Sequence, residues 1–308
     1  MDRSSRIKQV VLDFDGTCTQ VPEIFRAYLE NYLKGFRAFF TDEIKRMKLA
    51  GGDKLTASDW ENALSEVRCH SPKAGWTLAG CPSAPAAADP YILADESAKL
   101  ILRRRGIAFP TIPFTVGRAA YESCVAPWRP EVPDVFAKLI SAGIKLHIVS
   151  NSSSAFIAGR LKDLFGADSS LMQEINVQSD AGKFRVTELT WEDSSVFTQE
   201  ARNRFASLPV ACSKSSVELG RPLYLRRGTY FEAIHKVIRG NWDELATTLF
   251  CGDIWEMDLA MPFALGGCVQ LIERAMPFET YPYEKQLLQE CGERGRFSQD
   301  LSGLLSWI

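Results

Sequence analysis

The chain has 308 residues and a mass of 34.4 kDa, enough for one large domain or for a core domain with an insertion. Hydrophobic residues make up 46% and charged residues 24% of the sequence, which is ordinary globular usage and excludes disordered, collagen-like and coiled-coil proteins. The formal net charge of −2 excludes a general attraction to nucleic acid or to anionic lipid, so we expect neither as a partner.

The sequence favours a cytoplasmic protein. Its first residues run from basic side chains through a short apolar stretch into carboxylates, which fits neither a signal peptide nor an anchor. No stretch approaches ~18 uninterrupted apolar residues, so we expect no membrane span. The eight cysteines lack the close pairs of a zinc site and the density of a disulfide scaffold, which indicates reduced thiols. The oligomeric state cannot be read from the sequence.

Three short apolar runs, at residues 10–12, 145–149 and 248–251, have the character of buried parallel strands. Helical spacing between and after them predicts helices over 135–142, 154–165 and 229–238. This alternation predicts an α/β fold with a doubly wound, Rossmann-like parallel sheet. Since ligands bind beyond the carboxyl ends of such strands, the polar residues that follow the three runs are candidates for one common pocket.

The segment between the first and second runs is far longer than a crossover connection of ~10 to 12 residues. Apolar spacings of three and four predict one long helix or two broken ones over 23–49, and further helices over 58–67 and 91–104. We therefore expect a mostly helical cap domain at 21–128, inserted into a core formed by 1–20 and 129–308.

Two later parts of the core are irregular or terminal. The segment at about 167–226 breaks the alternation of strands and helices, and its alternating residues at 175–177 and 184–189 predict a hairpin. The last residues, 301–308, are apolar enough to dock on the core.

A pair of carboxylates follows the first predicted strand. Asp13 and Asp15 stand two residues apart, so in extended geometry they point the same way, and Gly16 then allows a turn. Such a pair suits a displacement in which one carboxylate attacks phosphorus, while the other protonates the leaving oxygen and later deprotonates water. A solvated Asp-Gly turn at a strand end is the alternative interpretation of this motif taken alone.

The loop after the third predicted strand adds Asp253 and Asp258. With Asp13 and Asp15 these would gather up to four carboxylates, whose mutual repulsion in a cleft requires a cation. An oxygen-only ligand set beside an anionic substrate favours Mg²⁺. A turn or capping role is the alternative for Asp253.

Ser150 and Asn151, after the second predicted strand, can donate hydrogen bonds to a phosphoryl oxygen. A basic group must also offset the phosphate charge, and Arg227 stands just before a predicted helix where it can do so. Arg226 and Lys236 are alternatives for that cation.

These residues carry a family resemblance. Three segments follow the order and spacing of motifs one, two and four of the haloacid dehalogenase (HAD) superfamily. They are DFDGT at 13–17, HIVSNS at 147–152 and FCGDIWEMD at 250–258. The chain resembles the phosphohydrolases of this superfamily over its core, and the resemblance does not extend to the cap.

The resemblance implies a role for each motif residue. Asp13 would be the nucleophile and a magnesium ligand, and Asp15 the general acid and base, whose backbone carbonyl also binds the metal. Ser150 would hold the phosphate, and Asp253 would complete the protein ligands. Asp258 corresponds to the second acidic position of motif four, which supports the metal or the basic residue.

The sequence departs from the family pattern at two positions. Motif three is usually Lys, whereas the best-placed residue here is Arg227, and Cys18 stands where an aliphatic residue is commoner. An arginine can contact phosphate with two parallel hydrogen bonds, so this substitution is chemically tolerable.

The resemblance also limits which reactions of the superfamily we expect. The dehalogenases of the superfamily lack the acid at position 15 and the P-type ATPases carry Lys there, so Asp15 favours hydrolysis of a small phosphorylated substrate. A phosphomutase uses the same residues and stays open, as does a binding or regulatory module that keeps the fold without hydrolysis.

Overall fold

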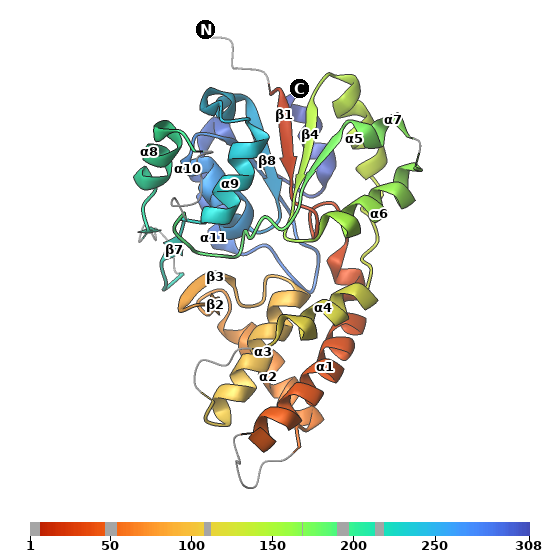
Figure 1. Cartoon of the computed structure of the whole chain (residues 1–308), viewed down its shortest axis with the longest axis vertical. Helices are drawn as coiled ribbons and strands as arrows, with labels where there is room; N and C mark the ends of the chain where they lie inside the picture. Colours follow the sequence, from red (N-terminus) through yellow and green to blue (C-terminus); the bar gives the residue numbers. More distant parts are fainter. Residues whose placement is uncertain (1–6, 47–53, 108–111, 168, 190–196, 213–218) are drawn as a thin grey trace.

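The computed structural model describes residues 7–46, 54–107, 112–167, 169–189, 197–212 and 219–308. At its centre is a six-stranded sheet of order β10-β9-β8-β1-β4-β5, in which every neighbouring pair is parallel (Figure 1). The strands are β1 (Gln9–Leu12), β4 (Lys145–Val149), β5 (Ile175–Gln178), β8 (Thr248–Gly252), β9 (Cys268–Ile272) and β10 (Gly295–Ser298). The predicted α/β fold with a doubly wound, Rossmann-like sheet is confirmed, and the three predicted strands are β1, β4 and β8.

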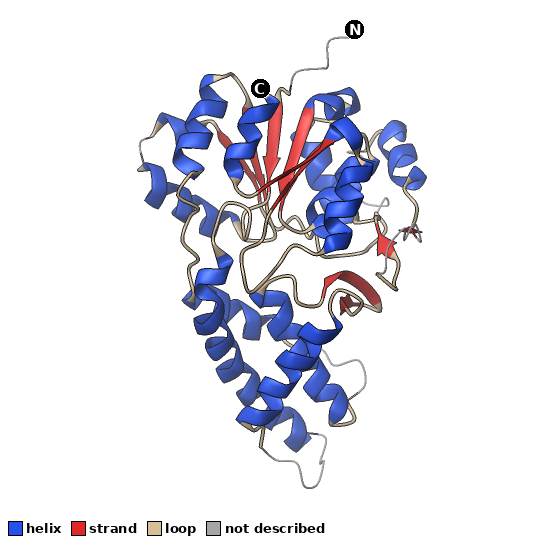
Figure 2. Cartoon of the chain, turned by 180° about the vertical axis from the view of Figure 1, so that it is seen from behind, coloured by secondary structure: helices blue, strands red, loops and turns tan. Residues whose placement is uncertain are grey.

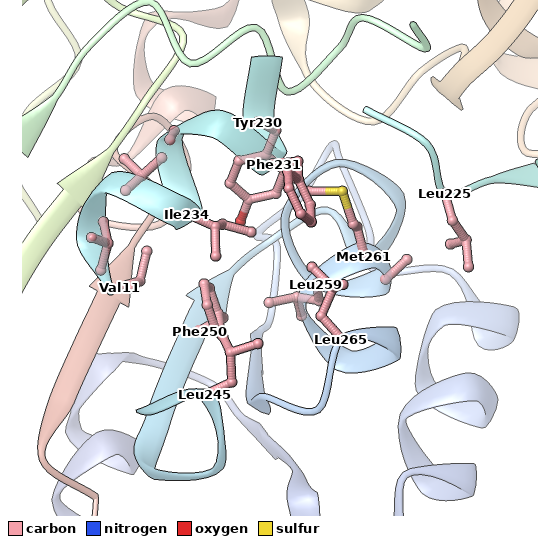
Figure 3. Close-up of a cluster of buried hydrophobic side chains, with 14 of the residues drawn as sticks. Val11, Leu225, Tyr230, Phe231, Ile234, Leu245, Phe250, Leu259, Met261 and Leu265 are labelled. Atoms are coloured by element: carbon pink, nitrogen blue, oxygen red, sulfur yellow. The ribbon is translucent and has the colours of Figure 1, made fainter. Parts of the chain in front are cut away.

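Helices cover both faces of this sheet, because successive side chains of each buried strand point to opposite faces. Val10 and Leu12 of β1 pack into one hydrophobic cluster, whereas Val11 packs into another, with Phe250 of β8 (Figure 3). The helices of the first cluster are α5 (Val132–Ser141), α6 (Ser154–Phe165) and the 3₁₀ helix η6 (Leu301–Trp307). Those of the second are α8 (Gln199–Ser207), α9 (Gly228–Val237), η3 (Trp242–Thr247), α10 (Ala260–Ala264) and α11 (Pro282–Glu290). The predicted docking of residues 301–308 is confirmed, since Leu301 and Leu304 are fully buried.

The segment between β1 and α5 forms a second lobe beside the carboxyl edge of the sheet (Figures 1 and 2). Its elements are η1 (Val21–Ile24), α1 (Phe25–Arg46), α2 (Ala57–His70), β2 (Gly75–Leu78), β3 (Cys81–Pro85), α3 (Pro90–Arg104) and α4 (Phe114–Ser123). We call this lobe the cap. Its core is aromatic, with Tyr32, Phe36 and Trp60 packed ring to ring.

The predicted helices of the cap are present, together with two features that were not predicted, helix α4 and the antiparallel pair of β2 and β3. The helix expected over 23–49 begins as η1 and continues as α1 to Arg46, and residues 47–49 lie outside the described residues. Both features contact the core: Ser83 of β3 bonds Arg227, and Tyr121 of α4 bonds Asp15.

The two connections between cap and core run side by side. The backbone amide of Gln20 donates to the carbonyl of Pro127 at 2.8 Å, and that of Arg129 donates to the carbonyl of Cys18 at 2.9 Å. These bonds hold the outgoing and returning chain together directly beside the first motif.

The predicted hairpin over 175–189 is wrong. Residues Ile175–Gln178 form β5, an edge strand parallel to β4, and Thr187 makes only an isolated bridge to Arg227. Two hydrogen bonds draw the intervening chain across the carboxyl edge of the sheet instead: Ala181 N–H to the carbonyl of Ser150 at 2.9 Å and Lys183 N–H to Oδ1 of Asn151 at 2.8 Å. Tertiary contacts therefore replace the local pairing that the alternation suggested.

The remaining elements are short. They are α7 (Ser170–Gln173), the antiparallel pair β6 (Ala211–Cys212) and β7 (Leu223–Tyr224), the π-helical turn η4 (Trp255–Leu259) and η5 (Gly292–Arg294). Across the described ranges, no helix has both the length and the apolar character that a membrane crossing requires. The eight cysteines are present as thiols and form no disulfide among themselves.

His147 of β4 makes the stability of the fold depend on pH. The side chain is buried, neither ring nitrogen has a hydrogen-bond partner among the described residues, and burial with nearby Lys145 and Arg239 lowers its pKa from 6.5 to about 4. The unfolded chain binds a proton at this residue below pH ~6.5 but the folded chain does not, so stability falls as the pH drops from about 6.5 to about 4. We expect this histidine to cost about 2 kcal/mol of unfolding free energy between pH 7 and pH 5.

Urea unfolding of the wild type and of His147→Leu at both pH values measures this contribution, because every other titrating group is common to the two proteins. The wild type should lose stability relative to the variant at pH 5. An equal change in both proteins would mean that His147 is protonated in the folded state.

Candidate active site

The sheet order brings the three motif loops together. β1 lies between β4 and β8, and Leu12, its last residue, is in register with Ile148 and Cys251. The strands are parallel, so the residues after each of them emerge at one edge of the sheet, the edge that faces the cap (Figure 1). The predicted convergence of the loops after β1, β4 and β8 follows directly from this topology.

Three carboxylates meet at that edge. One oxygen from each of Asp13, Asp253 and Asp258 lies within 4.8 Å of the others. The hydroxyl of Thr17 lies 3.4 Å from Oδ2 of Asp13 and 3.3 Å from Oδ1 of Asp253, and so bridges two of them.

Two glycines make this close approach possible. Gly16 has a φ of +86°, and a Cβ there would lie 2.5 Å from Oδ2 of Asp253. A Cβ on Gly252 would lie 2.2 Å from the Cβ of Asp258. Any side chain at either position would push the carboxylates apart.

Lys183 places a buried cation within the carboxylates. Its Nζ contacts Oδ1 of Asp13 and lies 2.8 Å from Oδ1 of Asp258, and its side chain is 1% exposed. Asp258 is itself fixed, because its Oδ2 accepts a hydrogen bond from the backbone amide of Ile254 at 3.0 Å and its carbonyl accepts one from Tyr230 at 2.8 Å. Asp258 thus holds the ammonium group beside Asp13.

The pKa shifts reflect first the burial of the site and then the charges gathered in it. Burial raises the pKa of Asp13 to about 7, against the opposing pull of Lys183. Burial, with Asp258 and Asp13 beside it, raises the pKa of Asp253 well above its ordinary value. Burial alone would lower the pKa of Lys183, but Asp13 and Asp258 outweigh it and raise that pKa. The ammonium group of Lys183 is therefore charged. It does not by itself balance the negative charge that ionised Asp13, Asp253 and Asp258 would carry.

Asp15 lies apart from this cluster and is held by hydroxyl groups. Ser152 Oγ donates to Oδ2 of Asp15 at 2.8 Å, and the hydroxyl of Tyr121, from α4 of the cap, lies 3.0 Å from Oδ2 and 3.2 Å from Oδ1. Burial raises the pKa of Asp15, and the two hydroxyl donors oppose that rise. A carboxylic acid with a raised pKa is suited to exchange protons near neutral pH.

Ser150 and Asn151 stand at the end of β4, as predicted. Ser150 is buried, and its Oγ accepts a hydrogen bond from the backbone amide of Ser152 at 3.1 Å, which leaves the hydroxyl hydrogen free to donate. The side-chain oxygen of Asn151 accepts the hydrogen bond from Lys183 N–H and so shapes the loop that carries the cation. Phosphate binding by these two residues stays a prediction.

The three basic residues considered from the sequence lie elsewhere. Arg227 is fully buried, and its guanidinium donates to Oγ and the carbonyl of Ser83 in β3, at 2.9 and 2.7 Å, and to the carbonyl of Lys183. Arg226 bonds the carbonyl of Leu208 and the carboxylate of Glu188, and Lys236 is exposed. Arg227 therefore joins the cap strand to the backbone of Lys183, and Lys183 occupies the place beside Asp13 where the sequence analysis expected an arginine.

The sequence analysis did not single out Lys183 and Tyr121, and it quoted Ser152 without a role. Lys183 lies between the second and fourth motifs, where a family lysine would be sought, but in the segment expected to be a hairpin. The sequence around Tyr121 offers no comparable signal, because its partner Asp15 is 106 positions away.

The donor set fits a hard divalent cation. The carboxylates of Asp13 and Asp253 and the hydroxyl of Thr17 offer oxygen atoms only, which is the chemistry Mg²⁺ prefers. The raised pKa values of Asp13 and Asp253 indicate that Lys183 alone does not neutralise the site. An added cation would relieve that imbalance.

Comparison with known proteins gives structural matches only. No protein-family model matches the chain, and no curated protein matches its sequence. Solved structures of HAD-like hydrolases match nearly all of it at low identity. The chain resembles the haloacid dehalogenase superfamily.

Three of these solved structures serve as examples of the matches. A HAD-hydrolase from Bacillus subtilis bound to magnesium has 12% identity and a TM-score of 0.45, with 98% of each chain covered. A haloacid dehalogenase-like hydrolase from Xanthomonas campestris has 12% identity and a TM-score of 0.44, covering 98% of this chain and 94% of the other. A protein described as a predicted phosphoglycolate phosphatase from Haemophilus somnus has 10% identity and a TM-score of 0.45, with 97% of each chain covered. A dehalogenase also matches, at 16% identity and a TM-score of 0.41.

Proposed function

We propose that this protein is a magnesium-dependent phosphatase that hydrolyses a small phosphorylated substrate through a phospho-aspartate on Asp13. The observation that carries the proposal is the pair of differently held carboxylates after β1. Asp13 contacts a buried ammonium group, whereas the carboxylate of Asp15 is held only by hydroxyls among the described residues. One carboxylate is thereby suited to attack and the other to transfer protons.

In the first half of the reaction Asp13 attacks phosphorus and the ester bond to the leaving oxygen breaks. Asp15 gives its proton to that oxygen, so the product leaves as a neutral alcohol. Lys183, held by Asp258, and the hydroxyl of Ser150 offset the negative charge on the phosphoryl oxygens. Lys183 takes the part that the sequence analysis gave to Arg227.

In the second half Asp15, now a carboxylate, removes a proton from water, and the water oxygen attacks phosphorus. The bond between phosphorus and Asp13 breaks, which releases inorganic phosphate and restores both side chains. Arg227 serves this chemistry indirectly, since it holds the backbone of Lys183 against β3 of the cap.

The carboxylates of Asp13 and Asp253 would hold Mg²⁺ together with the backbone carbonyl of Asp15, a ligand implied by the family resemblance. The ion would supply positive charge beside the phosphoryl oxygens. Asp258 would support the site through Lys183 without binding the metal directly.

Asp15 also supports phosphate ester hydrolysis over dehalogenation. Halide is a stable anion that needs no proton in order to leave, whereas an alkoxide does. As a proton donor in the first step, a buried acid two residues after the nucleophile assists only the second kind of leaving group.

Phosphate release from a broad panel of phosphorylated metabolites, with Mg²⁺ and again with EDTA, tests the proposal. We expect release from one or a few compounds, at least about 100-fold slower in EDTA and restored by excess Mg²⁺, because the carboxylates need a cation to bind a phosphate ester. The same panel should include 2-haloacids with detection of halide. Halide release, or phosphate release that EDTA does not affect, would contradict the proposal.

A further inference from the structure

A tyrosine of the cap reaches the proposed acid of the core. The hydroxyl of Tyr121 lies 3.0 Å from Oδ2 of Asp15 and 2.8 Å from Oγ of Ser152, which itself lies 2.8 Å from Oδ2 of Asp15. Tyr121 belongs to α4, and Ser152 to the loop between β4 and α6. Oδ2 of Asp15, Oγ of Ser152 and the hydroxyl oxygen of Tyr121 therefore form a triangle, to which the core contributes two atoms and the cap one.

The ring of Tyr121 is itself fixed. Its centroid lies 4.9 Å from that of Phe156 in α6 of the core and 5.4 Å from that of Tyr91 in α3 of the cap. A ring packed against two other rings loses little further freedom when its hydroxyl binds a partner. The contact with Asp15 is thus preorganised by packing.

Hydroxyl groups suit a residue that must act as an acid and then as a base. A hydroxyl can donate to a carboxylate and can also accept from a carboxylic acid by turning its hydrogen. An ammonium or amide donor would favour only the anion. Tyr121 and Ser152 can therefore hold Asp15 in the same place through both halves of the reaction.

We propose that Tyr121 is a positioning residue, which together with Ser152 orients Asp15 for proton transfer to the leaving group and from water. This inference rests on the proposed function, since it assigns Asp15 its proton-transfer role. Tyr121 acts through Asp15 and not on the substrate. The cap would thereby supply part of the proton-transfer apparatus as well as cover the site.

Kinetics of Tyr121→Phe test this assignment, because phenylalanine keeps the ring packing and removes only the hydroxyl. We expect kcat to fall about tenfold or more, a part of the ~100- to 10,000-fold that a positioned acid–base contributes, with KM changed less than about threefold. The loss should be larger for an alkyl phosphate than for p-nitrophenyl phosphate, whose leaving group needs little protonation.

Tyr32→Phe is the matched control. Tyr32 is a buried tyrosine of the cap whose hydroxyl lies 3.3 Å from a carboxylate, Asp95, within the core of the cap. Removal of the Tyr32 hydroxyl should lower the free energy of unfolding about as much as Tyr121→Phe does. It should leave kcat and the dependence of kcat on the leaving group unchanged.

A double-mutant cycle with Asp15→Asn gives the decisive result. If Tyr121 acts through Asp15, Tyr121→Phe has no further effect on kcat once Asp15 is asparagine. Additive losses, or a Tyr121→Phe enzyme with the wild-type dependence on leaving group, would overturn the inference while leaving the proposed phosphatase intact. A wild type that releases no phosphate from any ester would instead refute the proposed function.

Discussion

Asp13→Asn should reduce phosphate release by at least about a thousandfold, the scale on which removal of a nucleophile affects other covalent catalysts. Asparagine fills the same space and keeps an oxygen beside Thr17, but its amide is a far weaker nucleophile than a carboxylate. The variant also removes one negative charge from a site where burial raises the pKa of Asp13 to about 7. Initial rates under saturating substrate and Mg²⁺, with thermal unfolding as a check on folding, measure the effect.

The intermediate itself can be detected. Asp15→Asn should slow breakdown of the phospho-enzyme, because no carboxylate then activates water, so intact-mass measurement after rapid quenching should find one added phosphoryl group. That group should be missing when Asp13 is also asparagine. Asp134→Asn is the matched control, since Asp134 is an exposed aspartate of α5 paired with Lys138, and its activity should stay at the wild-type level. Retained turnover in Asp13→Asn would refute the assignment of the nucleophile.

Lys183→Met should lower kcat/KM by about 100- to 1,000-fold, the range found when a preorganised charge-stabilising donor is removed. Methionine approximates the length of the lysine side chain but carries no charge, so Asp13, Asp258 and the phosphoryl group would face one another without a cation. The competitive inhibition constant for inorganic phosphate should rise as well, because that anion uses the same ammonium group. Steady-state rates with inorganic phosphate as inhibitor measure both quantities.

Arg227→Met separates binding of phosphate from support of the fold. The guanidinium is fully buried and makes three hydrogen bonds to Ser83 and Lys183. Its removal should therefore lower the free energy of unfolding by a few kcal/mol. The phosphate inhibition constant should change much less than in Lys183→Met. If Arg227→Met weakens phosphate inhibition more than Lys183→Met does, the original sequence-based assignment to Arg227 is the better one.

Local sequence patterns were sufficient for the strands that carry the motifs. Short apolar runs identified β1, β4 and β8 within a residue at each end, and helix α6 matches its predicted range. These elements are buried on both faces or have a clear apolar stripe, so their identity depends on neighbours close in the chain. The hairpin expected over 175–189 failed because hydrogen bonds to Ser150 and Asn151, distant in sequence, decide that segment.

In the candidate site, too, some residues follow from local sequence patterns and others only from tertiary contacts. The sequence by itself determined the candidates Asp13, Asp15, Asp253, Asp258 and Ser150, because each belongs to a motif that begins at the end of a recognisable strand. Only the tertiary structure decided which side chains complete the site. Lys183 lies 170 positions from Asp13, and Tyr121 lies 106 positions from Asp15, in segments without a motif of their own. Proximity between such residues arises from the packing of whole elements, the cap against the core and the 180–185 segment across the sheet edge, and packing of that kind leaves no local pattern to read.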